Sequence, residues 1–131
     1  MPDVVVMKAE PSEHAAALAT LVAAGFPRAA EDGVTADEVV LLARMAGALV
    51  GVIHGRTVEL GPVSVVDHLG VLPGYRRQGV GRALLDEYYV RERGFGAERI
   101  EVRDAPGSAE RLRPFYEACG FDWAGNGFVR A

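Results

Sequence analysis

Short apolar runs, separated by glycine, proline and polar residues, divide the chain into strand and helix candidates. A run predicts a strand when it is rich in β-branched residues or alternates between apolar and polar positions. Five runs fit this description: residues 3–9, Val39–Met45, Leu49–Val58, Val63–Val71 and Arg99–Arg103. The turn signals Ala46-Gly47 and Gly61-Pro62 separate the three central strands.

Three further segments have the spacing of amphipathic helices. Leu18, Leu21 and Val22 predict the first helix, and Gly25 ends it. The second helix is predicted over residues 80–93 by an apolar stripe. The third is indicated by i, i+3, i+4, i+7 spacing and a glycine cap, at Leu112, Phe115, Tyr116, Cys119 and Gly120.

Pro114 lies within the third helical segment and leaves two alternatives open. The proline either kinks the helix, because it removes a backbone hydrogen bond, or stands at the first helical position, where proline is tolerated. Residues 121–131 follow and predict a short hairpin around Gly125-Asn126-Gly127.

The order of elements is strand, helix, three strands, helix, strand, helix and hairpin, which predicts an α/β (α+β) fold with helices on a mixed sheet. The length of 131 residues indicates a single domain over residues 1–131. The one cysteine, Cys119, excludes an intrachain disulfide framework and a cysteine-rich zinc module. Because it lies near the C-terminal end of a helix, we expect it to be a core residue rather than a nucleophile.

Charge and hydropathy narrow the class of protein further. The formal net charge of -4 argues against a domain-wide basic footprint for nucleic acid. The longest apolar run, Ala15–Phe26, is too short to span a bilayer. We therefore expect a cytoplasmic protein with neither nucleic-acid nor membrane partners.

The segment of residues 71–82 carries the most specific chemistry. It holds three arginines, at positions 76, 77 and 82, and no acidic residue inside an acidic chain. It leads from a predicted strand into a predicted helix, whose first backbone N–H groups have no partner within the helix. The glycines at positions 79 and 81 allow a ligand to approach this backbone, so the segment predicts a phosphate or pyrophosphate site. The Gly-Lys-Ser/Thr ending of a Walker loop and the third glycine of a Rossmann loop are both missing.

The stretch Val71–Leu85, VLPGYRRQGVGRALL, resembles the acetyl-CoA motif of the GNAT superfamily of acyl-CoA-dependent N-acetyltransferases. The core pattern of that motif, Arg/Gln-x-x-Gly-x-Gly/Ala, is matched by Arg76, Gly79 and Gly81. A second family signature, a tyrosine helix that ends in Gly-Phe, is matched by Phe115–Phe121. The resemblance covers essentially the whole chain. It implies a mostly antiparallel central sheet with helices on both faces and a splayed strand pair that holds acetyl-CoA.

The resemblance implies acetyl-CoA as cosubstrate and no metal. The CoA pyrophosphate would be held by backbone N–H groups of the loop, those of Arg76, Arg77, Gln78, Gly79, Val80, Gly81 and Arg82. The pantetheine arm would pair with the strand edge at Leu69, Gly70 and Val71, and the Val71 amide would polarise the thioester carbonyl. The family often has an asparagine early in the last helix. Ala109 occupies that position, so Ser108 beside it is the candidate helix cap and cofactor contact.

The resemblance also assigns catalytic roles. Tyr116 matches the general acid that protonates the departing thiolate, a role for which a phenol of pKa near 10 is suited. Asp67 is the first candidate for the base or amine-binding carboxylate, and His68 is the second. Because they are neighbours on a strand, we expect their side chains to point to opposite faces, with one of them in the cleft.

His54 is expected to lie opposite His68 if the second and third central strands form a hairpin near Gly61. Such a pair could bind a metal or sense pH. The sequence offers no third ligand, so two ordinary strand histidines are the expected interpretation.

The leading functional hypothesis is acetyl transfer from acetyl-CoA to a primary amine by direct attack in a ternary complex. The alternatives are a non-catalytic acyl-CoA-binding or regulatory module on the same fold, and a nucleotide-binding phosphate loop. We expect a small-molecule amine as acceptor rather than a protein, and the acidic balance favours a cationic one. A homodimer would be the usual oligomer in this family.

Overall fold

The computed structural model describes residues 3–29, 34, 38–58, 62–103 and 109–131. Its strands are β1 (Val4–Lys8), β2 (Glu38–Met45), β3 (Ala48–Val58), β4 (Val63–Val71), β5 (Arg99–Arg103), β6 (Asp122–Trp123) and β7 (Gly127–Arg130). Its helices are α1 (His14–Ala23), α3 (Val80–Gly94) and α4 (Ala109–Ala118), with the 3-10 turns η1 (Pro11–Glu13) and η2 (Pro73–Tyr75). Among these helices, none has the length and apolar character that crossing a membrane requires.

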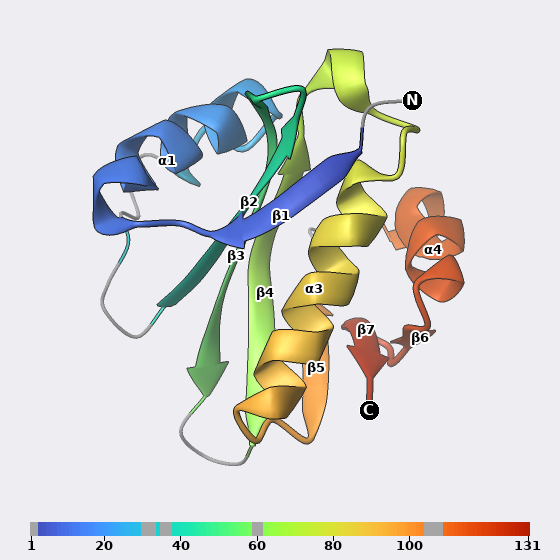
Figure 1. Ribbon diagram of the computed structural model, residues 1–131. Helices are drawn as coiled ribbons and strands as arrows, with labels where there is room; N and C mark the ends of the chain where they lie inside the picture. Colours follow the sequence, from blue (N-terminus) through green and yellow to red (C-terminus); the bar gives the residue numbers. More distant parts are fainter. Residues whose placement is uncertain (1–2, 30–33, 35–37, 59–61, 104–108) are drawn as a thin grey trace.

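The strands form one seven-stranded sheet in the order β1-β2-β3-β4-β5-β7-β6 (Figure 1). Neighbouring strands are antiparallel except for β4 and β5, which are parallel. Parallel neighbours need a crossover connection, and α3 supplies it. The predicted mixed, mostly antiparallel sheet is thereby confirmed.

The two faces of the sheet carry separate hydrophobic cores. Leu41 packs in one core with Leu84 of α3, whereas the next residue, Leu42, packs in the other core with Leu21 of α1. This separation follows from the alternation of side chains along a strand. Figure 1 shows α3 lying along one face with α4 beside it, while α1 covers part of the opposite face.

Each of α1, α3 and α4 ends in the same way, at a glycine with positive φ. The glycines are Gly25, Gly96 and Gly120, with φ of 114°, 103° and 87°. The next residue returns its backbone N–H to a carbonyl near the helix end, in the pairs Phe26 to Leu21, Ala97 to Glu92 and Phe121 to Tyr116, each with an N···O distance of 2.9 Å. These are Schellman caps, which satisfy the last carbonyls and fix the direction of the chain beyond the helix.

The predicted elements are confirmed. At the majority of strand and helix ends, the observed boundary differs from the predicted one by one or two residues. The last helix settles the alternatives for Pro114. Because α4 begins at Ala109, the proline lies inside the helix and not at its start. The predicted C-terminal hairpin is formed by β6 and β7, which pair through Asp122↔Val129 and Trp123↔Phe128.

Candidate active site

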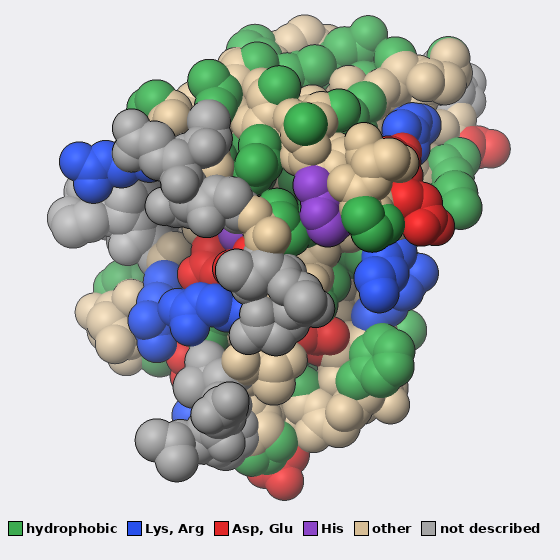
Figure 2. All heavy atoms as spheres, turned by 90° about the vertical axis from the view of Figure 1, so that its left-hand side faces the viewer, with side chains coloured by type: hydrophobic (Ala, Val, Ile, Leu, Met, Phe, Trp, Pro, Cys, Tyr) green, Lys and Arg blue, Asp and Glu red, His purple; other side chains and the backbone are tan. Residues whose placement is uncertain are grey.

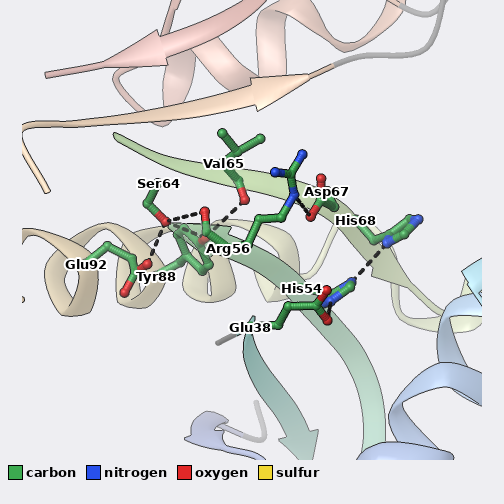
Figure 3. Close-up of polar contacts among 9 residues, drawn as sticks. All are labelled: Glu38, His54, Arg56, Ser64, Val65, Asp67, His68, Tyr88 and Glu92. Atoms are coloured by element: carbon green, nitrogen blue, oxygen red, sulfur yellow. Dashed lines mark hydrogen bonds and ion pairs between the residues drawn. The ribbon is translucent and has the colours of Figure 1, made fainter. Parts of the chain in front are cut away.

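The parallel pair β4 and β5 separates partway along its length. Their register runs from Val63↔Arg99 to Val66↔Val102 among the residues that the structure describes. Beyond Val66, β4 continues to Val71 while paired with β3 on its other side. Figure 3 shows the two strands diverging here. The edge of β4 from Asp67 to Val71, which includes the predicted Leu69, Gly70 and Val71, therefore borders a gap between parallel strands.

A β-bulge lies where the separation starts. His68 is opposite His54 and Val66 is opposite Gly55, so Asp67 is an extra residue in β4. A bulge bends its strand and interrupts the alternation of side chains. The bulge therefore gives β4 a direction that β5 does not follow.

The loop after β4 and the first turn of α3 form the predicted anion site. Gly79 has φ of 82° and precedes the first residue of α3, Val80. A Cβ built on Gly79 would meet no heavy atom within 4 Å, so the space in front of this backbone is open. The first helical backbone bond runs from Ala83 N–H to the Gly79 carbonyl at 3.0 Å. The earlier N–H groups of the first turn therefore have no partner within the helix and suit a phosphate.

The guanidinium group of Arg76 contacts protein carbonyls. Its Nε donates to the Val71 carbonyl at 3.0 Å, and its Nη2 donates to the Ala24 carbonyl at 2.9 Å. The side chain thus joins the loop to the end of β4 and to the end of α1. By contrast, Arg77 is exposed, and Arg82 pairs loosely with Asp86 at 3.7 Å.

The two glycines of the loop motif serve different purposes. Gly79 provides a left-handed turn facing open space, as described above. A Cβ on Gly81 would instead approach the Phe115 ring of α4 to 3.2 Å. The absence of a side chain at Gly81 therefore lets α4 pack closely against the start of α3.

Tyr116, the predicted general acid, lies next to Phe115 on α4. Its ring stacks on Phe128 of β7 with centroids 4.5 Å apart, and the residue is 6% exposed. In the Schellman cap at Gly120, the Phe121 backbone N–H donates to the Tyr116 carbonyl, so the end of α4 is fixed around Tyr116. Cys119, one turn further on, is buried, and burial raises the pKa of its thiol, as expected of a core residue.

The predicted contact Ser108 lies outside the residues that the structure describes.

A cavity of about 330 Å³ opens on the α1 side of the sheet beside the bulge. Its lining consists of charged and imidazole side chains from three strands: Glu38, His54, Arg56, Asp67 and His68. Figure 2 shows histidine, acidic and basic side chains near the middle of the face that lies on the left in Figure 1. Both predicted candidates for the base, Asp67 and His68, thus reach one cavity.

The expectation that neighbouring Asp67 and His68 would face opposite sides is therefore wrong. Regular alternation would separate them, but Asp67 is the bulge residue and falls outside that alternation. Val66 before it packs in the α3-side core, and His68 after it contacts Phe26, which belongs to the α1-side core.

Polar contacts connect the residues of the cavity in two groups (Figure 3). Arg56 donates from Nε to an oxygen of Asp67 at 3.1 Å. His54 contacts Glu38 through Nε2 at 2.7 Å and His68 through Nδ1, where the two Nδ1 atoms are 3.2 Å apart. The predicted placement of His54 opposite His68 is confirmed, and the two rings are parallel within 6°.

Sequence reasoning missed Glu38 and Arg56. The predicted strand begins at Val39, whereas the structure makes Glu38 the first residue of β2. One signal could have identified Arg56, which is two positions from His54 on the same strand and therefore faces the same side. Glu38 is paired with Arg56 on the neighbouring strand.

A second polar cluster lies on the α3 side of the sheet, and Figure 3 shows it beside the cavity residues. The Ser64 hydroxyl donates to Glu92 at 2.6 Å and lies 2.7 Å from the Tyr88 hydroxyl. All three side chains are buried, and burial raises the pKa of Tyr88. This cluster joins α3 to the sheet and is separate from the cavity.

Comparison with known proteins agrees with this geometry. Residues 36–122 match the profile of the acetyltransferase (GNAT) domain. The chain therefore belongs to the GNAT acetyltransferase family. No curated protein sequence matches it.

Solved structures of the family share the fold at low sequence identity. A GNAT-family protein from Desulfovibrio desulfuricans is 18% identical, with a TM-score of 0.78 over 97% of this chain and 96% of that one. The ribosomal-protein-S18-alanine N-acetyltransferase of Escherichia coli is 18% identical, with a TM-score of 0.76 over 97% and 90% of the chains. The PaiA N-acetyltransferase of Thermoplasma acidophilum, solved with coenzyme A, is 13% identical, with a TM-score of 0.72 over 97% and 96%.

Proposed function

We propose that the protein transfers the acetyl group of acetyl-CoA to a primary amine by direct attack in a ternary complex. The observation that carries this proposal is the separation of β4 from β5 at the Asp67 bulge. It leaves a strand edge bordering a gap, with an anion-binding helix start at one end and a polar cavity beside it. A cofactor with a pyrophosphate and an extended amide-containing arm suits this arrangement.

In this proposal both the pyrophosphate and the pantetheine arm of CoA bind to main chain. The pyrophosphate accepts hydrogen bonds from amides of Arg76 to Arg82, with Gly79 providing close approach. The pantetheine arm pairs with the edge of β4 from Leu69 to Val71, as an added strand would. The coenzyme A in the PaiA structure, which has the same fold, supports this choice of ligand.

The reaction requires one bond to form and one to break. The neutral amine nitrogen attacks the thioester carbon, and the C–S bond then breaks to release CoA thiolate. The Val71 amide stabilises the carbonyl oxygen during attack, and Tyr116 donates the proton that the thiolate takes up. The proton lost by the amine goes to a group in the cavity, where Asp67 and His68 are the candidates.

The cavity favours a small, cationic acceptor. Its volume of about 330 Å³ is in the range of small-molecule sites. Arg56 is paired with Asp67, so the second carboxylate, that of Glu38, leaves the lining with a net negative charge when the histidines are neutral. Such a site attracts an amine that carries a positive charge before it is deprotonated.

The cofactor half of the proposal is tested by thermal unfolding with acetyl-CoA, using Gly79→Ala and Gly47→Ala as a matched pair. Both glycines have left-handed backbones, with φ of 82° and 84°, and both face open space. Substitution therefore strains each backbone similarly, but only Gly79 lies at the loop. Ligand at 100 times its dissociation constant stabilises a protein by about 2.7 kcal/mol, which is several degrees for a chain of this size.

We expect acetyl-CoA to stabilise the wild type and Gly47→Ala by the same several degrees, and Gly79→Ala by much less. Release of CoA thiol with a panel of amines then measures transfer. An absence of stabilisation at millimolar acetyl-CoA would contradict the proposal. Equal stabilisation of Gly79→Ala and Gly47→Ala by acetyl-CoA would mean that the cofactor does not bind at the Gly79 loop.

One observation favours the alternative of a non-catalytic acyl-CoA-binding module. Tyr116 is 6% exposed and stacked in the core, where it has little contact with solvent. Stabilisation by acetyl-CoA without thiol release for any amine would support this alternative over the enzyme.

A further inference from the structure

We infer that Glu38, His54 and His68 form a proton relay that accepts the proton of the acceptor amine at His68 Nε2. The inference rests on the proposed acetyl transfer and names the group that deprotonates the acceptor. His68 is the base in this relay, and His54 and Glu38 are positioning residues that act through it.

The hydrogen bonds fix which nitrogen of each ring carries a proton. An ionised carboxylate is only an acceptor, so His54 donates its Nε2–H to Glu38 across 2.7 Å. A neutral imidazole has one proton, which leaves Nδ1 of His54 as an acceptor. The Nδ1 of His68, 3.2 Å away, must then be the donor. The lone pair of neutral His68 is consequently on Nε2, the atom that can take a proton.

The same contacts provide a path for the positive charge. When His68 Nε2 takes a proton from the ammonium form of the acceptor, its Nδ1 proton can move to Nδ1 of His54. The charge then lies on His54, whose Nε2–H is already bonded to Glu38. His54 is 3% exposed, so the carboxylate compensates for the loss of solvation that a buried imidazolium suffers. Transfer back to solvent through His68 resets the relay and leaves the acceptor amine neutral for attack. His68 Nε2 can then take the second proton, which the nitrogen loses as the amide forms.

The surroundings of the two rings favour His68 over Asp67 as base. Among the residues that the structure describes, the charged groups that line the cavity with them are Glu38 from β2, Arg56 from β3 and Asp67 from β4. Arg56 donates to Asp67 at 3.1 Å, so this carboxylate already has a cationic partner within the cavity, whereas the charged partner of the histidine pair, Glu38, lies at its far end. From the end of α1 the contact is apolar, because the Phe26 ring meets His68 edge-on at a centroid distance of 5.4 Å.

A metal between the two Nδ1 atoms is the competing interpretation of the close approach. Among the described residues there is no group of three or more His, Cys, Asp or Glu side chains that could hold an ion. Glu38 is bonded to the far nitrogen of His54, on the side away from His68. The arrangement is therefore better explained as a chain of hydrogen bonds.

The first test is the protonation state of the ring nitrogens, measured by ¹⁵N NMR on the whole protein at a pH where both rings are neutral. We expect His68 to carry its proton on Nδ1 and His54 on Nε2. In Glu38→Gln the amide can donate to His54 Nε2 as well as accept from it, so the tautomer of His54 is no longer fixed. His68 should then show a mixture of both tautomers. Asp67→Asn, in the same cavity, should keep it. A proton on Nε2 of His68 in the wild type would overturn the relay.

The second test separates orientation from proton transfer. The side-chain oxygen of His54→Asn can accept from His68 Nδ1–H, as Nδ1 of His54 does, but it cannot be protonated. We expect it to keep the tautomer of His68 while kcat falls by roughly 100-fold, the lower end of what general acid–base catalysis contributes, with KM for acetyl-CoA unchanged. In Glu38→Gln the acidic limb of the kcat profile should move to lower pH, because the charge that stabilises the imidazolium is gone. In His54→Asn, a further Glu38→Gln change should not move that limb.

The outcomes distinguish this inference from the proposed function. If the wild type transfers acetyl groups but both variants keep its kcat and pH profile, the relay is wrong and the function stands. If the wild type binds acetyl-CoA and acetylates no amine, the function is wrong and so is the relay's role in it. Zinc titration that shifts the ring signals of both histidines at one equivalent would replace the relay by a metal site.

Discussion

Gly55 lies under the Tyr88 hydroxyl, where this side chain of α3 meets the sheet. A Cβ at this position would overlap the Tyr88 hydroxyl and the Val65 carbonyl. The Tyr88 hydroxyl is bonded at the same place, 2.7 Å from Ser64 and 3.3 Å from the Val65 carbonyl that accepts from it. The missing side chain is therefore what allows a buried polar contact between helix and sheet.

We expect Gly55→Ala to lower the free energy of unfolding by about 3 kcal/mol, because overpacking and a broken buried hydrogen bond add. Gly94 of α3 is the matched control, since a Cβ there would meet nothing within 4 Å and its φ is not positive. Gly94→Ala should raise stability by about 0.5–1 kcal/mol through helix propensity. Urea unfolding measures both, and equal effects of the two substitutions would contradict the structural reason.

At the scale of elements, the bulge in β4 is the feature on which the site depends. Val66 faces the α3-side core and His68 faces the α1 side, so removal of Asp67 would restore regular alternation without turning any side chain over. A straight β4 would also lose the bend that separates it from β5.

We therefore expect deletion of Asp67 to leave a folded protein that binds acetyl-CoA at least tenfold more weakly, as measured by calorimetric titration. Asp67→Ala is the control, because it removes the carboxylate but keeps the extra residue of the bulge. It should leave the affinity for acetyl-CoA unchanged. Full affinity without Asp67 would show that the bulge does not form the cofactor groove.

The elements themselves could be predicted from the sequence, because periodicity and turn residues are local signals. The bulge could not, since an extra residue inside a strand has no marker in the pattern of apolar positions. The error over Asp67 and His68 follows directly from it. Glu38 was missed because the apolar pattern that marks the strand begins one residue later, at Val39.

At the scale of the whole molecule, one side chain joins segments that are far apart in sequence. Arg76 donates to the carbonyl of Val71 at the end of β4 and to that of Ala24 at the end of α1. The second contact lies within the Schellman cap that holds Phe26 against His68. The loop before α3 and the cavity are thereby connected through the end of α1.

We expect Arg76→Ala to speed amide hydrogen exchange at Ala24, Gly25 and Phe26 by roughly tenfold, because a hydrogen bond that tethers this turn contributes about 1–1.5 kcal/mol. Arg77→Ala is the control, since its exposed side chain comes from the neighbouring position. It should leave exchange in this turn unchanged. Unchanged exchange in Arg76→Ala would mean that the tether contributes nothing in solution.

The family could be predicted from two short motifs, because the phosphate loop and the tyrosine helix place specific residue types at fixed spacing. The cavity could not, because its five lining residues come from three strands and none of them belongs to either motif. The position of His54 opposite His68 could be expected from the turn signal between their strands, but the pairing of Glu38 with Arg56 and the bulge at Asp67 could not.

The bulge has a consequence in genetic terms. Asp67 is a single codon, and the strand on either side of it keeps the pattern of a regular hairpin. If deletion of Asp67 has the expected effect, insertion of one codon into an ordinary sheet is enough to separate a pair of strands and to add a carboxylate to a pocket, with Val66 and His68 still on their own faces. A binding groove of this kind can arise or vanish in one mutational step while selection on folding stability has little to act on.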